Sequence, residues 1–134
     1  MRISIVSLLF SMRLATCCEC VPSGVKAELR SSEIVFTGTI TEVDSARVKF
    51  AVHRVYKGRV PVEFEMPNLV LGDCMAGFRA GAIQLGKELL VYAWHDKFFA
   101  EGFVTHYCSR TRSVEFAAED LSKLGRGRPP DPQK

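Results

Sequence analysis

The feature that most constrains this chain is a cluster of three cysteines, Cys17, Cys18 and Cys20, directly after an apolar N-terminal segment. The other two cysteines, Cys74 and Cys108, lie far along the chain. Cys18 and Cys20 are not expected to bond to each other, because a disulfide needs Cβ atoms about 4 Å apart and an extended segment separates such residues further. Each is therefore expected to bond with Cys74 or Cys108, which would fasten the start of the domain to distant segments.

Residues 1–17 have the pattern of a secretory signal peptide. The start is positively charged, the apolar run is about ten residues long before Arg13, and Ala15 and Cys17 occupy the positions before a cleavage site that must be small. A bilayer requires ~20 apolar residues, so no membrane span is expected. Cleavage after Cys17 would make Cys18 the first residue of a secreted, extracellular protein, or of a periplasmic or cell-envelope protein in a bacterial host.

Two alternatives remain open for this leader. Residues 14–17 also form a poor version of a lipoprotein signal, in which Cys17 would be retained and would carry a lipid anchor. The apolar run would otherwise be the first buried strand or helix of a cytosolic protein. The odd number of cysteines favours cleavage, because four can pair within the domain while Cys17 leaves with the signal peptide.

After the leader, the composition predicts one globular domain, residues 18–125, with a single core. The nine phenylalanines and the 47% hydrophobic content argue against a disordered chain. Loss of the two leader arginines lowers the formal net charge from +3 to +1, which predicts no general attraction to nucleic acid or acidic lipid. We expect a monomer.

Five segments of the domain are predicted to be β-strands. The first three combine β-branched residues with apolar and polar alternation and are separated by turns, so they predict an antiparallel meander. Gly38 suggests a bulge and Pro61 an edge position. The fourth is a nearly continuous apolar run, expected to be buried on both faces. Together they predict a mainly β fold, a small barrel or sandwich, and their ranges are 33–43, 47–55, 60–66, 88–94 and 98–107.

A short amphipathic helix is expected between the cysteine cluster and the first strand, ending near Ser32. Val25 and Leu29 fall on one helical face, while Glu28 is expected to point elsewhere.

A second helix is expected at residues 113–124, with Ser113 as its N-cap and Gly125 as its stop. Residues 126–134 contain no apolar side chain apart from prolines and predict a disordered tail. The apolar stripe that would pack this helix on the barrel consists of Ala117, Leu121 and Leu124.

Enzyme activity and a bound cofactor are not expected. No Ser/His/Asp or paired-carboxylate arrangement has a spacing that indicates catalysis, and a Cys-x-Cys redox pair would need an exposed pair without distant partners. A zinc site would require Cys18, Cys20, His106 and Cys108 in a cytosolic chain, and the leader argues against it. Residues 126–129 match the core of an AT-hook for DNA, but four residues match often by chance and a solvated tail is the plainer interpretation.

The order of these features resembles the netrin-like domain. The Cys-x-Cys pair after a signal peptide, a short helix, the strand segments, a mid-chain cysteine and the Cys108 segment before a closing helix follow the pattern of that domain over about residues 18–124. The nearest type is the N-terminal domain of tissue inhibitors of metalloproteinases, especially short single-domain relatives. The resemblance implies a five-stranded Greek-key, OB-like barrel with flanking helices, and pairing of Cys18 with Cys74 and of Cys20 with Cys108.

The resemblance also implies a mechanism. The free α-amine and carbonyl of Cys18 would bind the catalytic zinc of a target metalloprotease, and the side chain of Glu19 would enter its specificity pocket. A retained Cys17 would turn that amine into an amide and remove the ligand. The alternative is a non-inhibitory netrin-like module that binds a protein at the cell surface or envelope. The implied inhibitory edge consists of Cys18, Glu19, Cys20, Val21, Pro22, Leu71, Gly72 and Asp73.

Overall fold

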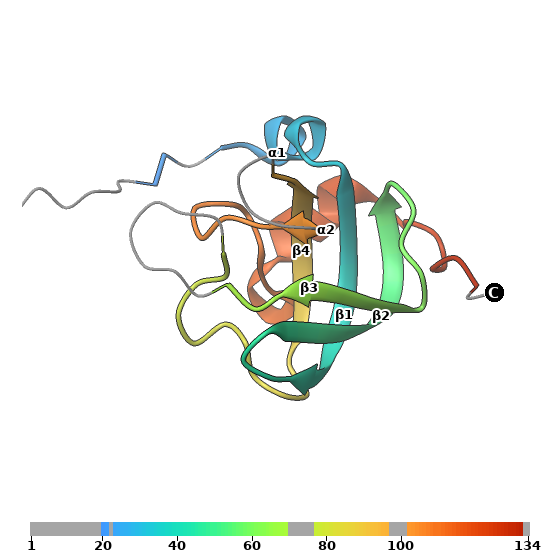
Figure 1. Cartoon of the computed structure of the whole chain (residues 1–134). Helices are drawn as coiled ribbons and strands as arrows, with labels where there is room; N and C mark the ends of the chain where they lie inside the picture. Colours follow the sequence, from blue (N-terminus) through green and yellow to red (C-terminus); the bar gives the residue numbers. More distant parts are fainter. Residues whose placement is uncertain (1–19, 22, 70–76, 97–101, 133–134) are drawn as a thin grey trace, which may run out of the picture.

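The computed structural model describes residues 20–21, 23–69, 77–96 and 102–132 of the chain. Within them the fold is mainly β, and five antiparallel strands form a nearly closed barrel with helices at its flanks (Figure 1). The strands are β1 (Ile34–Val43), β2 (Arg47–Lys57), β3 (Glu63–Pro67), β4 (Glu88–His95) and β5 (Phe103–Val104), with a short β6 (Arg112–Ser113) beside β4; the helices are α1 (Val25–Ser31), η1 (Val114–Phe116) and α2 (Ala118–Leu124).

The strand order β3-β2-β1-β4-β5 confirms the predicted Greek key. β1, β2 and β3 form the expected meander, and β4 returns by a long connection to pair with β1, which is the defining arrangement of that motif. The rings of Phe64 on β3 and Phe103 on β5 lie 5.8 Å apart between centroids. This contact brings the two outer strands together and nearly closes the barrel.

β1 contains the predicted irregularity at Gly38. Its pairing with β2 shifts register between Thr37 and Gly38, as a bulge does. A Cβ at Gly38 would lie 3.1 Å from the carbonyl oxygen of Ala51 and 3.3 Å from the Cβ of Phe50. Glycine therefore lets the two strands approach where the sheet bends around the core.

β4 is buried on both faces, as predicted, and separates two apolar clusters. Leu89, Val91 and Ala93 belong to the barrel core, which also contains the perpendicular rings of Phe36 and Phe50. The opposite face of β4 packs under the helices. This second cluster consists of Val35, Leu90, Tyr92 and Ala117, with Leu29, Tyr56, Leu121 and Leu124 against it.

The C-terminal helix differs from the prediction at its start. Ser113 makes no side-chain cap bond, because its backbone pairs with Leu89 as part of β6. A 3₁₀ turn follows, and α2 begins only at Ala118. Gly125, with φ of 77°, ends the helix as predicted. Likewise, of the predicted fifth strand only Phe103–Val104 is a strand among the described residues.

The C-terminal segment corrects the prediction of a disordered tail. Residues 126–132, here called the C-terminal strap, run along β2, where Val55 and Arg128 exchange two backbone hydrogen bonds of 2.8 Å. β3 pairs only with the first half of β2, so the strap satisfies backbone groups that would otherwise be unpaired. Prolines favour the extended conformation that this pairing needs. The charged residues of this segment and its lack of apolar side chains did not predict this pairing with β2.

Among the described residues, no helix is long and apolar enough to cross a membrane.

Candidate functional site

One disulfide fastens the N-terminal segment to the barrel. Cys20 and Cys108 are bonded across a sequence separation of 88 residues, with Cα atoms 5.0 Å apart, which confirms this predicted pair. Cys108 lies in a tight turn, in which the Ser109 amide donates to the carbonyl oxygen of His106 at 2.8 Å. The Cys108 amide donates to Nδ1 of the same histidine at 3.0 Å. The N-terminal segment is thus attached to an ordered turn.

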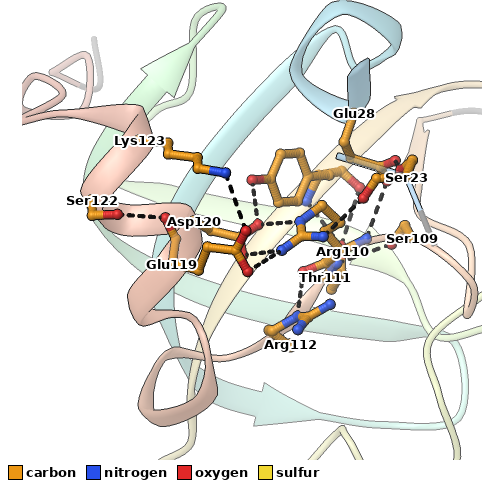
Figure 2. A network of polar contacts seen from close by, with 11 residues as sticks. Ser23, Glu28, Ser109, Arg110, Thr111, Arg112, Glu119, Asp120, Ser122 and Lys123 are labelled. Carbon is orange, nitrogen blue, oxygen red and sulfur yellow. Dashed lines mark hydrogen bonds and ion pairs between the residues drawn. The ribbon is translucent and has the colours of Figure 1, made fainter. Parts of the chain in front are cut away.

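A largely covered arginine anchors the same segment a second time. The guanidinium of Arg110 donates through Nη1 to the carbonyl oxygen of Ser23 at 2.8 Å. Its Nε and Nη2 atoms donate to the two carboxylate oxygens of Asp120 on α2, both at 2.7 Å (Figure 2). The side chains are 12% and 1% exposed, and the hydroxyl of Tyr92 donates to Asp120 at 2.8 Å. Arg110 therefore ties the N-terminal segment to α2 and β4.

The surroundings of Asp120 keep it ionised. Burial by itself would raise the pKa of this carboxyl, but the hydrogen bonds from Arg110 and Tyr92 outweigh burial and hold the pKa below its usual range. The same hydrogen bond raises the pKa of Arg110, and burial followed by the bond to Asp120 raises the pKa of Tyr92. We call Arg110, Asp120 and Tyr92 the node: at neutral pH it contains a close ion pair between Arg110 and Asp120 and a neutral phenol, and the exposed Glu119 lies 3.6 Å from the same guanidinium.

Glu28 completes the polar network from α1, contrary to the expectation that it points away from the apolar face. Its side chain is buried and accepts hydrogen bonds from the hydroxyl of Ser23 at 2.6 Å and from the amide of Arg110 at 3.1 Å. The three residues converge in Figure 2. Glu28 therefore holds the segment before α1 and the segment after Cys108 against each other.

The anchored segment borders an open hollow of about 400 Å³. Val21 stands at its rim with 82% of its side chain exposed, between anchors at Cys20 and Ser23. A fixed, projecting apolar side chain beside a concavity is suited to contact with another protein. We call this surface the N-terminal edge; its hollow is lined by Val21, Ser23, Glu28, Ser31, Trp94, His106, Cys108 and Ser109.

Only part of the inhibitory edge implied by the sequence can be located. Cys20 and Val21 lie together at the N-terminal edge. The remaining residues of that edge, and the other implied disulfide, lie outside the described residues: Cys18, Glu19, Pro22, Leu71, Gly72, Asp73 and Cys74.

The zinc-site alternative from the sequence is wrong. Cys20 and Cys108 are bonded to each other and so cannot supply thiolates to a metal ion. Within the described ranges, no group of three histidines, cysteines or carboxylates could hold a metal ion. The same disulfide gives Cys20 a distant partner, as the argument against a Cys-x-Cys redox pair assumed.

No protein-family model and no curated protein sequence matches this chain.

Sequence reasoning missed the node around Arg110, although a signal was present. Asp120 lies three residues after Ala117 and one before Leu121, within the apolar stripe of α2. Glu28 likewise lies three residues after Val25 on α1. A carboxylate on the buried face of a short helix needs a charged or hydrogen-bonding partner. Two of them, on different helices, could have indicated a shared partner residue, which is Arg110: its guanidinium binds Asp120 and its backbone amide donates to Glu28.

Proposed function

We propose that this chain is a secreted protein-binding domain of the netrin-like type, and that its N-terminal edge inhibits a zinc metalloendopeptidase. The observation that carries the proposal is the double anchoring of the segment from Cys20 to Ser23, by the disulfide and by Arg110, with Val21 exposed between the anchors. Anchors on both sides of Val21 restrict it before binding, so less conformational entropy is lost when a partner contacts it. Rigidity of this kind favours an inhibitor, which must dock without being cleaved.

The proposed chemistry lies two residues before the anchored segment. With the leader removed after Cys17, the α-amine and carbonyl oxygen of Cys18 would coordinate the protease zinc in place of the hydrolytic water. Glu19 would enter the neighbouring pocket, where an unpaired carboxylate costs several kcal/mol. We therefore propose a target whose pocket presents a basic group.

The test compares two forms of the protein that differ only at the amine. One begins at Cys18 and the other carries one additional alanine before it, so that the amine becomes an amide while every described contact is retained. A panel of zinc metalloendopeptidases with apolar and basic pockets is assayed with both. We expect inhibition by the first form only, with at least about a hundredfold loss in the second, equivalent to about 2.7 kcal/mol.

Intact mass and N-terminal sequencing of the protein from its own host show where the leader is cleaved. A start at Cys17, with or without lipid, would contradict chelation by Cys18. Equal binding of a partner by both forms, without inhibition, would favour the second candidate, a non-inhibitory netrin-like interaction module. Glu19 is the feature that favours this second candidate, because a carboxylate suits few apolar specificity pockets.

A further inference from the structure

A second hollow lies at the other end of β4 from the N-terminal edge. Trp94 lines the first hollow and Leu89 the second; these residues are five positions apart on β4, which is about 16 Å along the strand. The second hollow measures about 220 Å³. That volume suits one or two side chains rather than a whole small-molecule ligand, since ligand pockets usually measure ~300–1,000 Å³.

The most exposed apolar group at this hollow is Phe116, whose side chain is 71% exposed. It lies at the end of η1, directly before Ala117, which is fully buried under α2. Burial of Ala117 in the second cluster leaves Phe116 beside the solvent. Together with the half-buried Ala82 in the lining, the ring provides an apolar surface on which a partner side chain can pack.

Three cations surround this apolar surface: Arg79, Lys87 and Arg112. The Nε atoms of the two arginines donate to backbone carbonyl oxygens, from Arg79 to Tyr107 at 2.8 Å and from Arg112 to Arg110 at 3.1 Å. These bonds orient the guanidinium groups and leave their Nη atoms for a ligand. In the described part of the chain none of the three cations forms an ion pair, and no carboxylate lines the hollow.

The acidic neighbours limit what can bind. Glu88 and Glu115 line an adjoining hollow that shares Lys87 and Ser113 with this one. An extended polyanion, such as a sulfated glycan or a nucleic acid, would run from the cations onto these two carboxylates and be repelled. It would also leave the ring of Phe116 without an apolar partner. A short ligand with alternating carboxylate and apolar groups meets neither difficulty.

We propose that this hollow docks a short acidic segment of a partner protein. A carboxylate of the segment binds the guanidinium groups of Arg79 and Arg112, whose planar fork matches two carboxylate oxygens. An adjacent aliphatic or aromatic side chain packs on Phe116. The site is separate from the N-terminal edge, so the domain can hold one protein there and a second protein here.

The test uses a capped, fluorescein-labelled hexapeptide of alternating glutamate and leucine, and the purified full chain with its disulfide formed. Fluorescence anisotropy measures binding to the wild type and to Phe116→Ser and Arg112→Gln. We expect each substitution to weaken binding about tenfold, or ~1.4 kcal/mol. Two matched controls, Leu85→Ser at a 69% exposed leucine and Lys26→Gln on α1, should leave affinity unchanged.

Several results would overturn the proposal. One is equal binding of a peptide with glutamine in place of glutamate. Another is no binding up to about 1 mM peptide, which corresponds to ~4 kcal/mol. Tighter binding of a heparin hexasaccharide or inorganic phosphate, weakened by Arg112→Gln but not by Phe116→Ser, would show an anion site instead. The alanine-extended form should bind the hexapeptide normally, so failure of the inhibitor proposal is distinguishable from failure of this one.

Discussion

The two ends of the described chain are fastened by the same device with different surroundings. At the N-terminal edge, Arg110 donates to the carbonyl oxygen of Ser23; at the C-terminal strap, Arg54 donates to those of Arg126 and Gly127, at 2.9 to 3.1 Å. The side chain of Arg110 is only 12% exposed and is neutralised by the buried Asp120, and a disulfide lies nearby. Arg54 is partly exposed and has no ion pair among the described residues.

The difference predicts which end keeps its geometry more firmly. A guanidinium that is buried with a counter-ion holds its geometry, because separation of the pair would leave a charge without water. A partly exposed guanidinium can exchange protein carbonyls for water at little cost. We therefore expect the N-terminal edge to stay ordered under conditions in which the C-terminal strap already exchanges with solvent. Four predictions test this difference.

Removal of the disulfide should have the largest effect. Cys20→Ser with Cys108→Ser opens a loop of 88 residues, and we expect the free energy of unfolding to fall by about 4 kcal/mol. Guanidinium denaturation at pH 7 measures the change. The amide of Val55, which donates to the strap, should show the same rate of hydrogen exchange by local opening as in the wild type. A loss below about 1 kcal/mol would show that Arg110 alone holds the edge.

Asp120→Asn should lower the free energy of unfolding by about 3 kcal/mol, because it leaves the largely covered guanidinium of Arg110 with only the exposed carboxylate of Glu119 as a counter-ion. The matched control is Glu119→Gln. Glu119 lies 3.6 Å from the same guanidinium but is 65% exposed, so we expect a loss of about 0.5 kcal/mol or less. Similar losses for both variants in denaturant titrations would contradict a node that depends on burial.

Acid should weaken the N-terminal edge by a smaller amount. The folded pKa of Asp120 is held below its usual value of 3.8, so its stabilising contribution is fully present above the unfolded pKa and is lost as the pH falls through the folded pKa. The stability difference between wild type and Asp120→Asn should therefore shrink from pH 6 to pH 2. Protonated Asp120 still forms hydrogen bonds, which makes this effect smaller than the substitution. A constant difference would contradict it.

The smallest loss of stability is expected for Gly127→Ala in the C-terminal strap. Gly127 has φ of 62°, and a Cβ there would lie 2.8 Å from the carbonyl oxygen of Val55 and 2.9 Å from the Tyr56 ring. We expect a global loss of about 1–2 kcal/mol and faster hydrogen exchange at the Val55 amide, which donates to Arg128. The control Gly86→Ala has a similar φ of 80° but no atom within 4 Å, so it should not affect that amide.

The strands followed from local patterns and their Greek-key order from the resemblance, whereas the polar node and the strap followed from neither. β1, β2 and β4 have alternating or continuous apolar sequences that tertiary contacts reinforce, so their prediction was confirmed. Arg110, Asp120 and Glu28 are charged residues that only three-dimensional contact makes buried. The strap has no side-chain pattern because it binds mainly through backbone atoms. The signal peptide, the pairing of Cys18 with Cys74 and the ridge at residues 71–73 stay predictions.

The position of β4 between two apolar clusters has a consequence for how the domain unfolds. Its odd-numbered residues from Leu89 face the barrel core and its even-numbered residues from Leu90 face the helices. A slip of one residue would move each set into the cluster that the other set fills now, and so disrupt the packing of both clusters at once. β4 therefore belongs to both layers. If either layer separates from β4, the packing of the other layer is lost as well. Barrel and helices should melt in one cooperative step.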